Sequence, residues 1–271
     1  MSIRTVLVNV DLNTKSPLGY SAGLAQAFGA TLLGVTADQP PAAFAGVDAY
    51  EASAEYYAAV RQEIDKSFLA AEERFRASVP AGTKSQWRAV VGDLASVVVE
   101  AALQADLIVT TQTGVTALGE AREINLGQII LGSGRPVLVT ASEGAPFKCD
   151  RVVIGWKDTR EARRAVADAL PFLARASEVK VLTIGEGDAA REQEGLDQIV
   201  GWLASHDVTA SSELILSDVG YIDVLESTAR AYHADLVVAG GYGHSRMREW
   251  LFGGMTRNLI AANTINRLFS N

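Results

Sequence analysis

A glycine-rich segment near the C-terminus contains the residue types of an anion-binding site. Residues 240–256 read GGYGHSRMREWLFGGMT and follow an apolar run that indicates a buried strand. Glycine allows positive φ and lets a ligand approach the backbone without a Cβ in the way. Gly253 and Gly254 precede a helical pattern, and a helix N-terminus with exposed amides attracts anions. The segment predicts a phosphate loop, to which Thr256 could add a hydroxyl donor; the alternative is that the glycines serve only as turn residues.

The other side chains of this segment allow two interpretations each. His244, Arg246 and Arg248 could neutralise phosphate charge, or they could be solvated surface residues. Trp250 and Phe252 could close over a ligand as a lid. Such aromatic residues more often anchor a loop to the core, and we favour that interpretation.

Other site chemistries lack the required spacing. Arg246 stands where a dinucleotide fingerprint needs its third glycine, and no G-x-x-x-x-G-K-[ST] loop occurs. Gly132-Ser133-Gly134 lacks the flanks of a nucleophile elbow. The single cysteine excludes an intrachain disulfide, and the three histidines show no metal-ligand spacing. We identify no general base directed at the glycine segment, so we expect no efficient enzyme; slow ATP hydrolysis remains open.

Composition sets the broad class. The chain has 271 residues, of which 48% are hydrophobic, and a net charge of −8. This length suits two domains, and the acidic balance gives no electrostatic help in binding nucleic acid or an anionic membrane. Any phosphate must therefore be held by local amides or a few placed cations. The N-terminus indicates a strand and not a signal peptide, and no apolar run reaches membrane-helix length, so we expect a cytoplasmic protein.

The chain repeats itself, which predicts its organisation. TVLVNVDLN at 5–13 matches RVVIGWKDT at 151–159, and ADLIVT at 105–110 matches ADLVVAG at 234–240. Ser, Gly and Pro within 141–150 indicate a linker. We therefore predict two α/β domains, residues 1–145 and 146–271, each with a parallel sheet between helices. The last strand, Thr264–Asn271, is weak in pattern, and we expect it to be irregular or frayed.

Apolar runs and helical periodicity give the expected elements. Strands are expected at Val6–Val10, Thr31–Thr36, Trp87–Val91, Leu107–Thr110, Pro136–Thr140, Val152–Trp156, Val179–Ile184, Glu213–Leu216 and Leu236–Ala239. Helices are expected at Pro17–Phe28, Tyr50–Ser78, Leu94–Leu103, Leu126–Leu131, Arg160–Ala174, Arg191–Ser205, Ile222–Tyr232 and Met255–Ala262.

The glycine spacing resembles a known signature. Gly240-x-x-Gly243, nine residues and then Gly253 is similar to the ATP-binding motif of universal stress proteins, and the two-fold repeat extends the resemblance over nearly the whole chain. In that family Ser or Thr follows the last glycine and a second hydroxyl comes two positions on; here Gly254 replaces the first and Thr256 keeps the second. The resemblance implies two flavodoxin-like (adenine nucleotide alpha hydrolase-like) domains, each a five-stranded parallel sheet of order 3-2-1-4-5 with helices on both faces.

The resemblance also implies a site. The C-terminal domain would bind an adenine nucleotide, either ATP or AMP. Mg²⁺ could accompany ATP. The implied residues are Gly240, Gly243, His244, Gly253, Gly254, Met255 and Thr256 of the glycine segment, together with Lys157 and Ile184. Lys157 could contact phosphate or ribose, and Asp158 or Thr159 could cap the next helix.

The first half departs from the motif. Its matching stretch begins at Thr110, passes Gly114 and a longer insert, and reaches Gly127. Thr110 replaces the leading glycine, and Glu120 and Glu123 would repel a phosphate. At the end of the first strand it has Asp11, where the family places an acidic residue facing the nucleoside. We predict that this half does not bind ATP in the family manner and acts as scaffold or internal dimer partner.

These observations favour a stress-response regulator that binds an adenine nucleotide in its C-terminal domain. The alternatives are a scaffold that binds no nucleotide and acts through protein partners, and a slow ATP hydrolase on the same fold. We expect the two halves to pair through their last strands, as an internal pseudo-dimer; the tandem chain could dimerise further.

Overall fold

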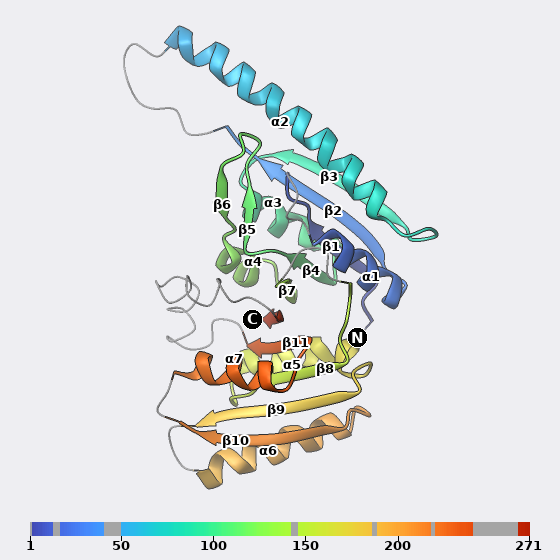
Figure 1. Ribbon diagram of the computed structural model, residues 1–271, viewed down its shortest axis with the longest axis vertical. Coiled ribbons are helices and arrows are strands. Elements are labelled where there is room, and N and C mark those ends of the chain that lie inside the picture. Colours follow the sequence, from blue (N-terminus) through green and yellow to red (C-terminus); the bar gives the residue numbers. More distant parts are fainter. Residues whose placement is uncertain are drawn as a thin grey trace.

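The structure is a computed structural model in which one ten-stranded sheet runs through both halves of the chain (Figure 1). It describes residues 2–12, 17–40, 50–141, 146–185, 189–217, 220–240 and 265–271, without the side chains of 50–54. The strand order is β10-β9-β8-β11-β12-β7-β4-β1-β2-β3. The sheet therefore consists of two repeats of order 3-2-1-4-5, as the resemblance to universal stress proteins implies.

The first half contributes five strands to this sheet. They are β1 (Thr5–Asn9), β2 (Thr31–Asp38), β3 (Ser85–Val91), β4 (Leu107–Thr110) and β7 (Val137–Val139). Its helices are α1 (Leu18–Phe28), α2 (Tyr50–Ser78), α3 (Leu94–Ala101) and α4 (Leu126–Gly132), with a 3₁₀ turn at Ala102–Gln104. The pairs that these five strands form with one another are all parallel.

The second half repeats the arrangement. Its strands are β8 (Arg151–Gly155), β9 (Glu178–Gly185), β10 (Ala210–Leu216), β11 (Leu236–Gly240) and β12 (Asn266–Ser270). Its described helices are α5 (Arg160–Leu173), α6 (Ala189–Ala204) and α7 (Tyr221–Ala231). The pairs within this half are also parallel. The helix expected at Met255–Ala262 lies outside the described residues.

The two halves join through their last strands, which confirms the expected pairing. β12 and β7 are antiparallel, with Leu268 opposite Leu138. The prediction that Thr264–Asn271 would be irregular is wrong, because β12 is a regular strand at the centre of the sheet. Leu268 and Phe269 are buried there. Burial between two neighbouring strands thus overrides the weak local pattern.

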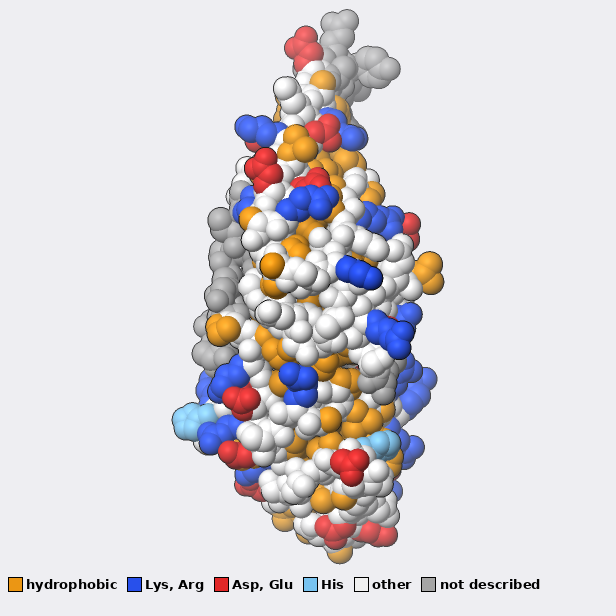
Figure 2. Space-filling model, turned by 90° about the vertical axis from the view of Figure 1, so that its right-hand side faces the viewer, with side chains coloured by type: hydrophobic (Ala, Val, Ile, Leu, Met, Phe, Trp, Pro, Cys, Tyr) orange, Lys and Arg blue, Asp and Glu red, His pale blue; other side chains and the backbone are white. Residues whose placement is uncertain are grey.

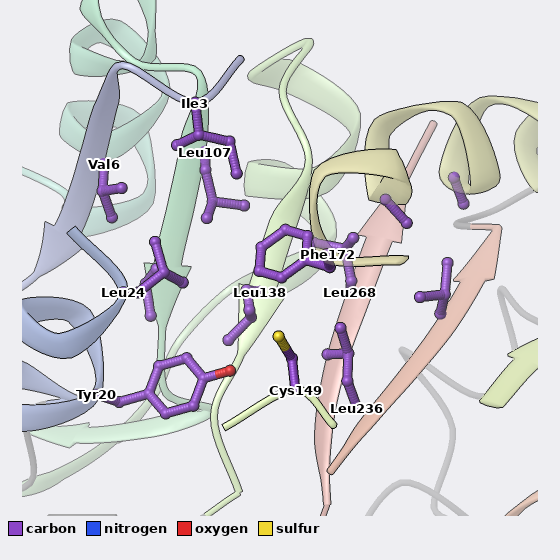
Figure 3. Packing of buried hydrophobic residues seen from close by; sticks show 14 of the residues in the cluster. Ile3, Val6, Tyr20, Leu24, Leu107, Leu138, Cys149, Phe172, Leu236 and Leu268 are labelled. Carbon is purple, nitrogen blue, oxygen red and sulfur yellow. The ribbon is translucent and has the colours of Figure 1, made fainter. Parts of the chain in front are cut away.

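The helices cover both faces of the sheet. Most of the buried apolar residues of α1, α2, α5 and α6 belong to one cluster that continues across both halves. On the opposite face, α3 and α4 cover the first half and α7 covers the second. Figure 3 shows the junction, where Leu138 of β7 and Leu268 of β12 lie among Tyr20, Cys149 and Phe172. The halves therefore share one core.

Local chemistry fixes where the helices begin and end. Asp93 caps α3 by accepting the Ser96 N–H, and Thr159 caps α5 by accepting the Ala162 N–H. Of the two cap candidates for α5, Thr159 is thus the cap, while Asp158 forms a two-pronged ion pair with Arg163. That hydrogen-bonded guanidinium holds the pKa of Asp158 below its usual range.

The surface has mixed charge. Figure 2 shows one face on which basic and acidic side chains are interspersed with hydrophobic ones. None of the described helices contains an apolar stretch of the length needed to span a bilayer.

The repeated Ala-Asp-Leu tripeptide has the same structural role in both halves. Asp106 accepts the N–H groups of Arg4 and Thr5 at 2.8 and 3.0 Å, at the start of β1. Asp235 accepts those of Asp150 and Arg151 at 2.9 and 3.0 Å, at the start of β8. Each aspartate therefore ties the beginning of the central strand of its half to the neighbouring strand.

Replacing Asp235 with alanine should lower the free energy of unfolding by about 1–3 kcal/mol, because two backbone donors lose a charged acceptor. Urea denaturation measures this loss. Asp197→Ala is a control on the exposed side of α6, where we expect a change within about 0.5 kcal/mol. Equal effects of the two substitutions would contradict the assigned role of Asp235.

Candidate functional site

The candidate site lies at the carboxyl ends of β8 and β11. These strands are parallel neighbours, with Gly155 beside Ala239. After β8 the chain continues through α5 to β9, which lies beside β8 in the sheet. On its other side β8 neighbours β11, and β11 in turn neighbours β12. This is the point where the strand order reverses, and open α/β sheets bind ligands at such points.

Two residues of the predicted site meet at this edge. Gly240 ends β11, and Lys157 follows β8 by two residues with an exposed side chain. The nearby strand β9 is linked in by Thr183, whose hydroxyl donates to the Trp156 carbonyl at 3.2 Å. Ile184 of β9 is half-buried and packs with the cluster under α7. Its side chain therefore contributes to the core beside the edge.

The other predicted site residues lie outside the described residues. They are Gly243, His244, Gly253, Gly254, Met255 and Thr256. The chain enters this segment at Gly240 and is described again from Ile265, just before β12. The glycine segment therefore starts at the switch point of the second half.

The N-terminus of α5 adjoins Gly240. A Cβ built on Gly240 would lie 2.6 Å from the Ala162 nitrogen and 2.7 Å from the Glu161 carbonyl carbon. Since both atoms are backbone, a side chain here would push the first turn of α5 off β11. Gly240 thus has a packing role that the sequence did not reveal. It also keeps the positive end of the α5 dipole at the site.

Gly240→Ala should destabilise the fold by about 1–3 kcal/mol, because the backbone of α5 must shift. Gly201→Ala is the matched control, since a Cβ at Gly201 meets nothing within 4 Å and the residue lies inside α6. That substitution should stabilise by about 0.5–1 kcal/mol. Thermal and urea unfolding of both variants measure the difference. Opposite signs are the expected result, and equal signs would contradict the packing role of Gly240.

Tyr221 is a further residue at this edge that the sequence analysis did not select. A Cβ on Gly155 would lie 2.5 Å from the Tyr221 hydroxyl oxygen, so the phenol occupies the space above the end of β8. Burial raises the pKa of Tyr221 to about 12, and the hydroxyl stays protonated at neutral pH. The signal in the sequence was a glycine inside a strand, which often marks the close approach of another group.

The equivalent edge of the first half is filled by its own chain. A hairpin of β5 (Thr113–Val115) and β6 (Ala121–Glu123) lies at the carboxyl ends of β1 and β2 (Figure 1). The sequence analysis noted an insert here but not the hairpin. Asp11, two residues after β1, accepts the Val115 N–H at 2.7 Å. Lys157 has the same position relative to β8, so the two halves differ in charge at this position.

A metal site would need a cluster of ligand side chains. Among the described residues, no group of three or more His, Cys, Asp or Glu side chains could hold a metal ion.

Comparison with known proteins identifies the fold. No family model matches the chain, and no curated protein matches it significantly. A universal stress protein from Archaeoglobus fulgidus DSM 4304 is similar in structure over 98% of this chain and 96% of its own, with a TM-score of 0.68 and 14% identity. A putative universal stress protein from Pseudomonas aeruginosa UCBPP-PA14 covers 99% and 93%, with a TM-score of 0.59 and 14% identity. The chain therefore has the tandem flavodoxin-like fold of universal stress proteins.

Proposed function

We propose that this chain is a tandem universal stress protein whose C-terminal half binds one adenine nucleotide, ATP or AMP. The observation that supports this most strongly is that Gly240, which lies against the start of α5, and Lys157 both lie at the switch point of the second half. The glycine segment begins at that point, and successive amides with a helix N-terminus favour a phosphate.

The charge difference between the halves supports the choice of half. Asp11 and Lys157 occupy equivalent positions after β1 and β8. The carboxylate in the first half is buried and accepts a backbone N–H, while the lysine in the second half is exposed. A cation at this edge stabilises phosphate oxygens, whereas a carboxylate repels them.

Mg²⁺ would accompany ATP. Mg²⁺ commonly keeps several waters and binds through substrate phosphates with one or two carboxylates, so it needs no dedicated cluster of protein ligands. The described edge offers a cation and helix amides, and the sequence analysis identifies no general base directed at the glycine segment, so we propose binding without efficient turnover. A role in the stress response, acting through protein partners in the cytoplasm, rests on the likeness of fold, which is an analogy.

Titration calorimetry with ATP and AMP tests the proposal. Lys157→Met should weaken ATP binding by up to about tenfold, because an exposed charge-assisted contact to phosphate is lost. It should weaken AMP binding less, since AMP has fewer phosphate charges. Lys84→Met is the control, because Lys84 is also exposed but precedes β3 in the first half. This variant should bind both nucleotides as the wild type does.

Three outcomes would count against the proposal. Wild-type protein that gives no heat with either nucleotide would favour the scaffold. Equal weakening by Lys157→Met and Lys84→Met would remove Lys157 from the site. Sustained phosphate release from ATP above background would favour a hydrolase over a binding protein.

A further inference from the structure

The hairpin of the first half is held by two buried carboxylates. Asp11 and Asp38 follow or end β1 and β2, and they are 1% and 4% exposed. Asp11 accepts the Val115 N–H at 2.7 Å, and Asp38 accepts the Ala117 N–H at 2.6 Å. These donors are two residues apart, on β5 and just after it. The carboxyl edge of the sheet thus binds the hairpin backbone at two points.

A basic side chain connects β6, the second strand of the hairpin, to the end of β2. Arg122 of β6 donates from Nη1 to the Asp38 carboxylate at 3.2 Å and to the Ala37 carbonyl at 3.0 Å. Its side chain is 17% exposed, so this ion pair is largely shielded from water. Asp38 therefore contacts the hairpin through both carboxylate oxygens.

The hairpin fits closely over this edge. A Cβ on Gly114 would overlap the Asp11 carboxylate, so only glycine lets β5 come this near. By contrast, Thr113, the preceding residue on the same strand, is exposed. Among the strands that the structure describes, β5 and β6 pair only with each other and not with the main sheet. The described polar contacts between the hairpin and the edge of the main sheet involve the side chains of Asp11, Asp38 and Arg122.

We propose that residues 113–123 form an internal strap that closes the carboxyl edge of the first half and can open as a unit while the sheet beneath stays folded. Asp11 and Asp38 are its latch. The closed strap covers the place that corresponds to the candidate site of the second half, so it makes the two repeats unequal. This inference concerns the first half alone and does not depend on nucleotide binding by the second.

Amide hydrogen exchange of the full chain tests whether the strap opens separately. In the wild type, the amides of Val115 and Ala117 should be protected. In Gly114→Val, their exchange should rise by about tenfold to a hundredfold, as expected when hydrogen bonds to charged groups are lost. The amides of β1 and β4 should keep their protection. Thr113→Val places the same valine side chain at the neighbouring, exposed position. This control should leave all exchange rates near those of the wild type.

Carboxyl labelling with a water-soluble carbodiimide and an amine gives a second readout. Exposed Glu120 and Glu123 should be labelled in every variant, whereas Asp11 and Asp38 should be labelled only in Gly114→Val. Loss of protection throughout the first half would overturn the inference, since the hairpin would then be part of the core. Unchanged exchange in Gly114→Val, or Asp11 and Asp38 that stay unlabelled after the hairpin opens, would overturn it as well.

Discussion

Glu226→Ala is expected to lower the free energy of unfolding by about 3–5 kcal/mol. Glu226 of α7 accepts from Arg267 of β12, with Nε and Nη2 lying 3.0 and 2.5 Å from Oε1. The two side chains are 6% and 8% exposed. Removing the carboxylate takes the charge and the hydrogen bonds of Glu226 away from a buried guanidinium, and this loss is costly because water cannot replace them there. Urea denaturation of the wild type and the variant measures the loss.

An exposed ion pair provides the matched control. Arg163 and Asp158 lie at a similar distance, but their side chains are 65% and 59% exposed. Arg163→Ala should change stability by no more than about 1 kcal/mol, because water screens the pair. The double variant Glu226→Leu with Arg267→Met should be less destabilised than Glu226→Ala, since it removes both charges. A double variant as unstable as Glu226→Ala would show that lost packing, and not the lost charge pairing between Glu226 and Arg267, causes the effect.

Phe172→Ala should destabilise the chain by about 3–5 kcal/mol, through lost burial and a remaining cavity. Phe172 of α5 is fully buried. Its ring packs edge-on against Phe28 of α1, with centroids 5.4 Å apart, and lies 6.4 Å from the ring of Phe147. These aromatic residues connect the first half, the linker and the second half (Figure 3 shows Phe172 at this junction). Chemical denaturation measures the total loss.

The part of the chain that Phe172→Ala destabilises is as informative as the total loss of stability. Because the aromatic cluster joins both halves, amide exchange should accelerate in β1 as well as in β8 when Phe172 is truncated. Leu103→Ala serves as the control, since Leu103 is 82% exposed, and it should change stability by less than about 0.5 kcal/mol. Acceleration confined to the second half would mean that the two halves are energetically independent.

Most of the fold could be predicted because the central strands of the sheet are buried on both faces. Parallel strands of this kind appear as continuous apolar runs, and LIVT of β4 and LVVAG of β11 are clear examples. The long Ala-, Glu- and Arg-rich pattern predicted α2 as Tyr50–Ser78, and the structure has the same bounds. The repeat predicted two similar halves, and the resemblance to universal stress proteins implied the order of the strands and the pairing of the halves.

β12 was misjudged because its polar residues have distant partners. Arg267 pairs with Glu226 of α7. The Asn266 side chain accepts the Ala141 N–H and donates to the Asp235 carbonyl, which lie 125 and 31 residues away in the chain. A local pattern cannot show that such groups will be satisfied inside a sheet. The tertiary contacts therefore decided the structure of this segment.

The hairpin and the packing at Gly240 were missed for different reasons. β5 and β6 have three residues each, too short for an alternating pattern to be recognised. At Gly240 the sequence suggested the close approach of a ligand, whereas the structure places the backbone of α5 there. A glycine at such a position indicates the close approach of another group, but the sequence does not identify that group.

Native mass spectrometry of gently purified chain, with and without added ATP, tests the central claim most directly. We expect one adenine nucleotide per chain, and none in Gly253→Val, where the glycine segment can no longer admit a phosphate. Two nucleotides per chain would contradict the assignment to the C-terminal half alone. No nucleotide in the purified protein and none after addition of ATP would contradict nucleotide binding itself.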